Sequence, residues 1–330
     1  MDSPANPASV WKKFKKAMTK QTRKDKAQPK AIEEPASVKE PIVPQEPPHA
    51  DTKALFKKLS HYKNGKAVLI GINYRGTDSE LNGCINDVKN MYDYLTVVEQ
   101  FDPNNIIVLT DESSSSLQRL PTNKNILANL RWLVNGNDGT DNISLFLHYS
   151  GHGSYMSDTN KDETDGKDEC ICPLDYAQSG FIIDDVLRAE LLPPIKNKPN
   201  VTLTCVFDSC HSGSILDMRY TVKLTRDSDS ITTLSIIENK QYDKSDCEVI
   251  CFSGCMDSQT SADAYINGKS QGMLTCAFLT TLSKYRKSST QLTFKKFIGE
   301  LQAYAATNGY EHVPQLSFNK YFDVKQLYAV

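Results

Sequence analysis

Two short polar segments carry side chains that could perform nucleophilic chemistry together. His152 lies in Ser-Gly-His-Gly at 150–153, and Cys210 lies in Asp-Ser-Cys-His-Ser-Gly at 208–213; each segment directly follows a short apolar run. Such runs, broken by Gly and Ser, are typical of strands that open into loops. In an open α/β sheet, ligands collect where the strands end. A cysteine and a histidine at two such ends can act as a thiol nucleophile and its proton acceptor.

The rest of the chain from residue 66 predicts a sheet that could hold these two ends side by side. Strand-like and helix-like segments alternate, which indicates an α/β fold with a mostly parallel central sheet and helices on both faces. Strands are predicted at 66–74, 106–110, 144–149, 202–207 and 248–253. Helices are predicted at 87–95, 123–134, 184–191, 274–285 and 294–305, with Thr122 capping the second. The polar, poorly patterned stretch 219–246 is predicted to be an exposed loop.

Composition divides the chain into a tail and one folded domain. Residues 1–60 are rich in Pro, and 11–30 hold nine Lys or Arg, so 1–60 is predicted to be a disordered tail and 61–330 the folded domain. The net charge of −2 argues against a nucleic-acid partner. No apolar stretch is long enough to span a bilayer, so we expect a cytoplasmic protein.

Within the tail, apolar residues at helical spacing stand among lysines. Trp11, Phe14 and Met18 have this spacing, and a basic amphipathic turn can touch an anionic membrane weakly. The alternative is a tail that stays solvated and disordered. Through this tail the protein could also be nuclear or associated with a membrane surface.

The two polar segments resemble the catalytic dyad of the caspase-fold cysteine proteases. The cysteine segment departs from the caspase form, Gln-Ala-Cys followed by Arg, Gln or Gly and then Gly, and is similar to that of metacaspases. Further segments that support the resemblance occur in order at 70–74, 81–87, 183–185, 253–263 and 314–317. Their spacing suits the shorter, type I layout. The resemblance implies a caspase-like fold in which Cys210 is the nucleophile and His152 the base.

The same resemblance implies the remaining parts of an active site. The backbone N–H groups of Gly153 and Cys210 would form the oxyanion hole. Asp87, Ser150 and Asp208 match the pocket of the family, and two carboxylates there favour an Arg or Lys side chain before the scissile bond. The alternative for Asp87 is that it caps a helix.

Calcium is the cofactor that the resemblance implies. Four carboxylates match those that bind activating calcium in metacaspases: Asp168, Asp184, Asp185 and Asp217. Oxygen ligands from separate loops suit calcium. The acidic run 158–165 is expected to be only a solvated face, because an EF-hand would need Gly where Glu163 stands.

The sequence therefore predicts a calcium-dependent cysteine endopeptidase, a zymogen with basic-residue specificity and self-processing. Basic residues for self-cleavage are Arg219, Lys223, Arg226, Lys240 and Lys244, besides those of the tail. The family implies a monomer and roles such as programmed cell death. Two alternatives stay open: a non-proteolytic caspase-fold scaffold in proteostasis, and a legumain-like or separase-like peptidase.

Overall fold

The computed structural model describes most of the predicted domain. The described residues are 65–137, 142–158, 166–210, 212–227, 230–242, 247–254, 263–266, 269–288, 290–310, 313–321 and 324. Contacts divide the chain into two units, Met1–Leu59 and Ser60–Val330, and all the described residues belong to the second. The predictions about the tail, its disorder and its membrane contact lie outside the described residues.

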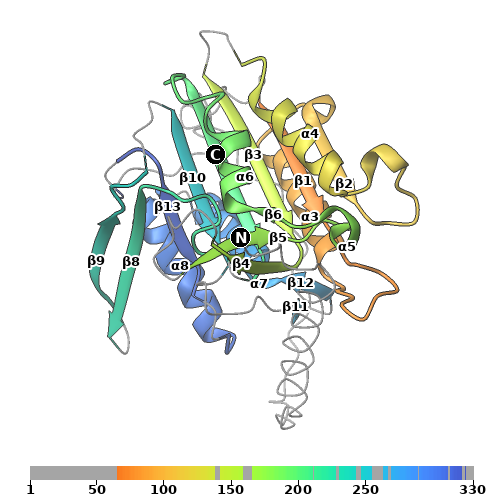
Figure 1. Cartoon of the computed structure of the whole chain (residues 1–330). Coiled ribbons are helices and arrows are strands. Elements are labelled where there is room, and N and C mark those ends of the chain that lie inside the picture. The colour runs from red at the N-terminus through yellow and green to blue at the C-terminus, as the bar shows by residue number, and fades with distance from the viewer. Residues whose placement is uncertain are drawn as a thin grey trace, which may run out of the picture. The chain divides into compact units, whose positions relative to one another are not determined.

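An eight-stranded sheet forms the centre of this unit (Figure 1). In sheet order its strands are β2 (Ile106–Thr110), β1 (Lys66–Gly71), β3 (Ile143–Ser150), β7 (Val201–Asp208), β10 (Glu248–Ser253), β13 (Gln315–Phe318), β8 (Tyr220–Asp227) and β9 (Ser230–Glu238). The first five are parallel to one another, and the last three are joined antiparallel. The predicted α/β class with a mostly parallel sheet is confirmed.

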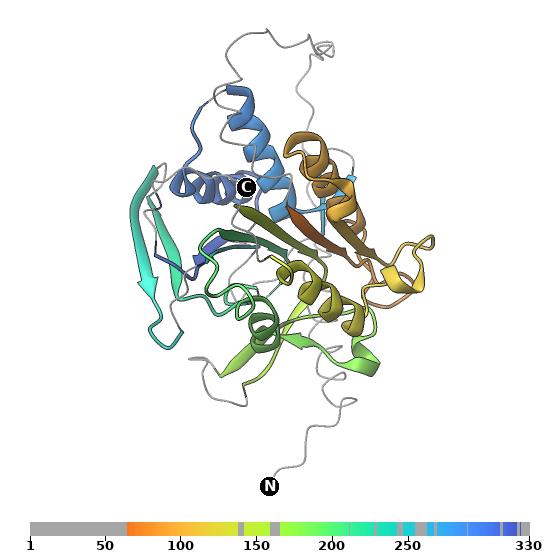
Figure 2. The same cartoon turned by 90° about the horizontal axis from the view of Figure 1, so that it is seen from above.

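Helices cover both faces of the sheet (Figure 2). One face carries α3 (Cys84–Asp93), α7 (Met273–Ser288) and α8 (Phe294–Thr307), and the other carries α4 (Asn123–Val134) and α6 (Asp184–Leu191). The predicted N-cap of α4 is confirmed, because Thr122 Oγ1 accepts a hydrogen bond from the Asn125 N–H at 3.3 Å.

Alternation along the strands divides the core between these two layers. Val68 and Ile70 of β1 belong to the same buried cluster as Ile126 and Leu130 of α4. On the opposite face, Phe252 of β10 packs against rings from α7 and α8, with centroids 5.3 and 5.0 Å away. Both sides of each central strand are therefore buried, as expected for a parallel sheet between two helical layers.

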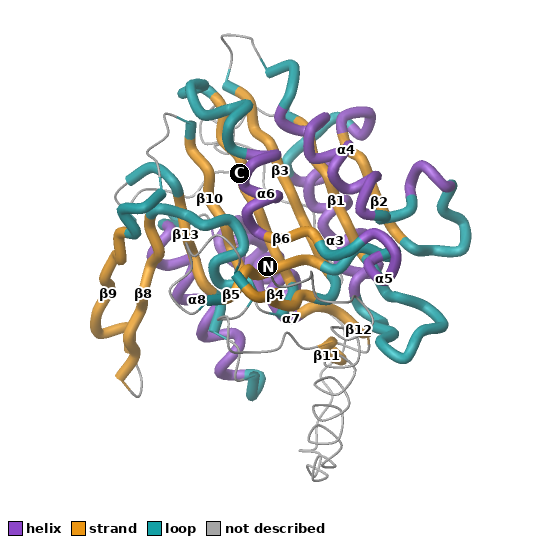
Figure 3. The backbone as a smooth tube through the Cα atoms, in the orientation of Figure 1, coloured by secondary structure: helices purple, strands orange, loops and turns teal. Residues whose placement is uncertain are grey.

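The prediction that 219–246 is an exposed loop is wrong for most of its length. Residues 220–227 and 230–238 form β8 and β9, an antiparallel pair at the sheet edge (Figure 3). Buried Tyr220 and Val222 alternate with more exposed Thr221 and Lys223, which is the period of a half-buried strand. Many polar side chains on the solvent face mask this period in the sequence.

Small elements that the sequence did not predict surround the carboxyl edge of the sheet. β4 (Gly153–Ser157), β5 (Lys167–Ile171) and β6 (Ile182–Ile183) form a three-stranded sheet, and β11 (Asp263–Ile266) pairs with β12 (Lys269–Gly272). α5 (Tyr176–Ser179) is a single turn. β4 begins one residue after His152 and β12 ends directly before α7, so both small sheets reach the predicted site.

Candidate active site

His152 and Cys210 follow the ends of two neighbouring strands in the middle of the sheet. β3 and β7 are parallel partners, and their last paired residues are Ser150 and Asp208. The predicted base and nucleophile therefore each lie two residues beyond the same pair. Their surroundings meet through the main chain, because a Cβ added to Gly153 would overlap the carbonyl oxygen of Cys210. The structure thus brings together the two segments that the sequence singled out.

The His152 ring is oriented by a main-chain oxygen from the loop that follows β1. Its Nε2 lies 2.7 Å from the carbonyl oxygen of Ser79. A carbonyl can only accept, so Nε2 carries a proton in this contact. In the neutral ring the lone pair is then on Nδ1, the atom that can take a proton from a thiol.

Several other cysteines are poor candidates for the nucleophile. Burial raises the pKa of Cys205, and it raises that of Cys251 to about 12. The pKa of Cys172 is raised well above its usual value by burial first, and then by the charges of Cys170 and Cys210. A thiol that stays protonated is a weak nucleophile. Cys210, in contrast, is partly exposed at a strand end.

Gly153 supplies the close approach that the predicted oxyanion hole requires. Two N–H donors must lie near one developing oxyanion, and here the main chains at 153 and 210 touch because Gly153 has no side chain. The donor role of the Gly153 and Cys210 N–H groups stays a prediction.

The three predicted pocket residues converge beside this dyad. Ser150 Oγ donates to Asp87 Oδ2 at 2.7 Å. A Cβ on Gly272 would overlap Asp208 Oδ2 and would lie 2.7 Å from Asp87 Oδ2, so both carboxylates lie against one glycine. Asp87 is 0% exposed and Asp208 3%. The structure therefore places two buried carboxylates next to each other.

Main-chain donors from the start of α7 hold these carboxylates. The Gly272 N–H is 2.9 Å from both oxygens of Asp87, and the Thr275 N–H donates to Asp208 Oδ2 at 2.7 Å. Asp87 does not cap its own helix, because α3 begins at Cys84 after Gly83 and that N-cap has no side-chain bond. Its carboxylate instead accepts hydrogen bonds from Ser150 of β3 and Gly272 of β12.

A buried histidine supports the same helix start from β3. His148 Nε2 lies 3.0 Å from Thr275 Oγ1, and Nδ1 has no hydrogen-bond partner in the described part of the chain. Burial lowers the pKa of His148 to about 3. This histidine is therefore neutral at ordinary pH and serves the fold beneath the pocket rather than proton transfer.

The four predicted calcium ligands come from three elements. Asp168 lies in β5, Asp184 and Asp185 begin α6, and Asp217 lies in the segment after Cys210. All are buried except Asp185, which is partly buried. Asp184 Oδ2 accepts the Glu169 N–H at 2.7 Å and its Oδ1 accepts the Asp185 N–H at 2.8 Å.

Two of these acids, Asp168 and Asp184, lie with Glu169 near buried Cys170. The pKa of Cys170 is raised by burial first and then by the charges of Asp184, Glu169 and Asp168. Ser214 Oγ donates to Glu169 Oε2 at 2.5 Å, which ties the segment after Cys210 to β5. Carboxylate oxygens are ligands that suit calcium. Over the residues that the structure describes, however, three or more His, Cys, Asp or Glu are nowhere grouped so that they could hold a metal ion.

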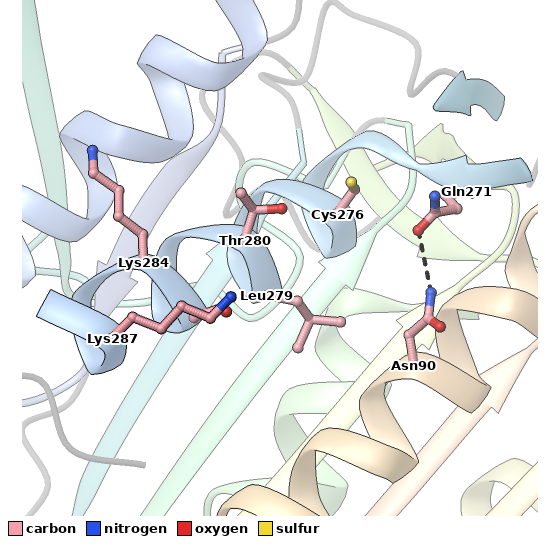
Figure 4. Close-up of a pocket in the computed structure, with 8 residues that line it drawn as sticks. Asn90, Gln271, Cys276, Leu279, Thr280, Lys284 and Lys287 are labelled. Atoms are coloured by element: carbon pink, nitrogen blue, oxygen red, sulfur yellow. Dashed lines mark hydrogen bonds between the residues drawn. The ribbon is translucent and has the colours of Figure 1, made fainter. Parts of the chain in front are cut away.

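A groove of about 480 Å³ lies on the α3 and α7 side and contains none of the predicted site residues (Figure 4). Asn90 of α3 and Gln271 of β12 face each other at one end, with Asn90 Nδ2 3.2 Å from Gln271 Oε1. Lys284 and Lys287 lie toward the other end, and Lys284 is paired with Glu300 at 2.8 Å.

Sequence reasoning missed three groups that hold the site residues. The Ser79 carbonyl carries no sequence signal, since every residue has one. Gly272 precedes the predicted helix 274–285, but its contact with Asp87 joins residues 185 positions apart. Tyr74 was part of the segment 70–74, yet nothing in its spacing tied it to His152.

Comparisons with known proteins identify relatives of this arrangement. Residues 65–219, which contain both His152 and Cys210, match the family model described as "Metacaspase, peptidase C14 domain". Metacaspase-1 of Kluyveromyces lactis is 37% identical over 298 residues, covering 78% of this chain and 66% of that protein, slightly less than two thirds. Metacaspase-1A of Aspergillus fumigatus is 36% identical over 303 residues, covering 80% of this chain and 71% of that protein.

A solved structure shares the fold. The crystal structure of protein GSU0716 from Geobacter sulfurreducens aligns with a TM-score of 0.52 and 20% identity, covering 80% of this chain and 97% of that one. Among the helices that the structure describes, none is both long and apolar enough to cross a bilayer.

Proposed function

The chain belongs to the metacaspase family of peptidases, and we propose that it is a calcium-dependent cysteine endopeptidase that cuts after Arg or Lys. The observation that carries the specificity is the pair of buried carboxylates, Asp87 and Asp208, against Gly272. Their position beside the Cys210 strand end supports a pocket for the residue before the scissile bond.

In the proposed reaction His152 Nδ1 takes the proton from the Cys210 thiol. The sulfur attacks the substrate carbonyl carbon, and the N–H groups of Gly153 and Cys210 stabilise the oxyanion. His152 returns the proton to the departing amine, which leaves a thioester on Cys210. Water then attacks the thioester with His152 as the base, and the acid product leaves.

The pocket chemistry favours a guanidinium or an ammonium. A carboxylate has about four lone-pair sites, so Asp87 and Asp208 can accept further bonds beyond those from Ser150 and the main chain. A guanidinium can donate to two acceptors at once, whereas Lys provides a single compact charge. An Asp side chain would be repelled by both carboxylates, and cleavage after Asp is not expected.

Calcium is proposed to act through Asp168, Asp184, Asp185 and Asp217. Their burial and oxygen-only chemistry support this. Bound calcium would neutralise these buried acids and hold the segment after Cys210 against β5. Asp184 can keep its main-chain donors and still use its second lone pairs for a cation.

Peptide hydrolysis by purified protein tests the proposal. Fluorogenic peptides ending in Arg, Lys or Asp are incubated with millimolar calcium or with a chelator, beside the Cys210→Ala variant. We expect turnover after Arg and Lys only, with calcium only, and none in the variant. Cleavage after Asp would refute the pocket assignment, and no Cys210-dependent cleavage of any peptide would favour the scaffold alternative.

Self-processing, a location in the cytoplasm and a monomeric state are parts of the same proposal. The described turn that follows β9 offers an exposed Lys240, which supports processing within 219–246. Sedimentation of the Cys210→Ala variant, which cannot cut itself, tests the oligomeric state directly.

A further inference from the structure

The main chain of His152 is held between two buried tyrosine hydroxyls. The His152 N–H donates to Tyr74 Oη at 3.1 Å, and Tyr149 Oη donates to the His152 carbonyl at 2.7 Å. Tyr74 and Tyr149 are 1% and 0% exposed. Both polar groups of the His152 backbone are therefore bonded to tyrosine side chains, one from the loop after β1 and one from β3.

The protons of these hydroxyls can be assigned. Tyr74 Oη donates its proton to the Cys172 carbonyl at 2.6 Å, so it can only accept from His152. Tyr149 donates its proton to the His152 carbonyl. The Cys172 N–H lies 3.2 Å from both Tyr149 Oη and that carbonyl oxygen and is shared between them. The two oxygens are 3.2 Å apart. Burial raises the pKa of both tyrosines, so the hydroxyls stay protonated and the network keeps one direction.

Tyr74 also contacts the imidazole and begins the loop that orients it. Its ring centroid lies 4.7 Å from that of His152, with 36° between the planes. Tyr74 has a φ of 50°, a left-handed conformation that is uncommon for a bulky residue. The Thr77 N–H and Oγ1 both donate to the Tyr74 carbonyl, at 3.2 and 2.7 Å. This turn leads to Ser79, whose carbonyl holds Nε2.

Gly151, directly before His152, leaves room for the two tyrosine hydroxyls. A Cβ added to Gly151 would lie 2.7 Å from Tyr149 Oη and 3.1 Å from Tyr74 Oη. Only glycine therefore lets the β3 end pass over the two hydroxyls. The left-handed backbone of Tyr74, kept by its surroundings next to His152, points to a functional constraint at this residue.

We propose that Tyr74 is a positioning residue, which fixes the His152 backbone through its hydroxyl and the His152 ring through its own ring and the Ser79 turn. This inference deepens the proposed peptidase function and rests on it. In this role buried Tyr74 acts only through His152, by holding the ring in the orientation in which Nε2 is bonded to Ser79 and Nδ1 is left to take the Cys210 proton. A small displacement of a catalytic group can cost about 100-fold in rate, so loss of one orienting hydroxyl should be measurable.

The test compares three Tyr→Phe variants of the full chain in calcium buffer. Tyr74→Phe keeps the ring and removes the bond to His152, and Tyr149→Phe removes the other bond. Tyr304→Phe is the control. Tyr304 lies in α8, away from the dyad, and is partly buried; its hydroxyl contacts Cys276 Sγ of α7 at 3.2 Å. The measurements are kcat and KM on an Arg peptide, thermal melting, and the rate of Cys210 alkylation by iodoacetamide against pH, followed on the Cys210 peptide by mass spectrometry.

We expect kcat of Tyr74→Phe to fall about 10-fold or more, with KM changed less than about twofold. The midpoint of the pH dependence of Cys210 alkylation should move to higher pH, because a misplaced imidazole assists thiolate formation less. Tyr149→Phe should change in the same direction, and Tyr304→Phe should match the wild type in both. If Tyr74→Phe behaves like Tyr304→Phe in kcat and alkylation, or if it only melts earlier, the inference is refuted.

Alkylation keeps the two proposals separate. It needs no substrate, so it tests the placement of His152 even if the wild type cleaves no peptide. A wild type without turnover but with a Tyr74-dependent alkylation midpoint would overturn the proposed function and support the positioning role. A wild type that cleaves Arg peptides with no effect of Tyr74→Phe would do the reverse.

Discussion

Gly153 and Cys210 touch through their main chains: any side chain at 153 would overlap the carbonyl oxygen of Cys210. We predict that Gly153→Ala lowers kcat about 100-fold or more, because the added methyl group separates the two N–H donors proposed for the oxyanion. Peptide hydrolysis measures the loss. Ser157→Ala, at an exposed position of the same strand, should keep full activity. Equal activity of the two variants would contradict the proposed role of Gly153 in the oxyanion hole.

Asp87 should determine the charge preference of the pocket. Asp87→Asn keeps the shape and the bond from Ser150 but removes one negative charge, so kcat/KM for Arg and Lys peptides should fall about 10- to 100-fold, at about 1.4 kcal/mol for each factor of ten. Asp93→Asn, on the exposed face of the same helix, is the control and should change nothing. An unchanged preference for Arg in Asp87→Asn would contradict the pocket assignment.

Calcium binding should depend on Asp184. In the inactive Cys210→Ala background, saturating calcium should raise the melting temperature, since a ligand at 100 times its dissociation constant stabilises by about 2.7 kcal/mol. Adding Asp184→Asn should abolish that rise, and adding Asp93→Asn should preserve it. Differential scanning calorimetry with and without calcium measures both, with no need for peptidase activity. A rise that persists in the Asp184→Asn protein would exclude this site.

We predict that buried His148 makes the free energy of unfolding fall in acid. Its pKa is depressed to about 3 by burial, so below the unfolded value of about 6.5 the unfolded chain binds a proton that the folded chain does not. Its contribution to stability is therefore complete above pH 6.5 and is lost as pH falls from 6.5 toward 3, by about 1.4 kcal/mol per pH unit. Urea unfolding at pH 7.5 and 5.5 should show a smaller pH-dependent loss for His148→Gln than for the wild type. Equal losses would show that this ring does not contribute.

Self-cleavage within 219–246 should avoid β8 and β9. Lys223 lies in β8, which is paired on both sides, and the Arg219 guanidinium binds Glu238 at 2.8 Å and also the Tyr242 carbonyl. Exposed Lys240 lies two residues after the end of β9, while Lys244 lies outside the described residues. We predict that Lys240→Gln slows calcium-induced cleavage of this region and that Lys223→Gln does not. Mass spectrometry of the fragments reads the bond, and a cut after Arg219 or Lys223 would contradict the prediction.

Most strands and helices of the central layers could be predicted from the sequence. The five parallel strands and the five helices of the two layers follow from apolar period and length, because burial on both sides demands continuous apolar runs. The ends of helices α4 and α6 agree with the predicted bounds. The β8–β9 pair escaped prediction, because a strand at the sheet edge needs few apolar residues and its pairing with distant β13 leaves no local pattern.

Residue type and position in the chain were enough to mark His152, Cys210, Asp87 and Asp208 as candidates, because they are chemically distinctive and stand at the ends or starts of predictable elements. The groups that hold them could be found only in the folded chain. The Ser79 carbonyl, the Gly272 N–H and the Tyr74 hydroxyl act through contacts across 73, 185 and 78 residues of chain. Main-chain atoms are the same in every residue, so their role depends on where the folded chain places them.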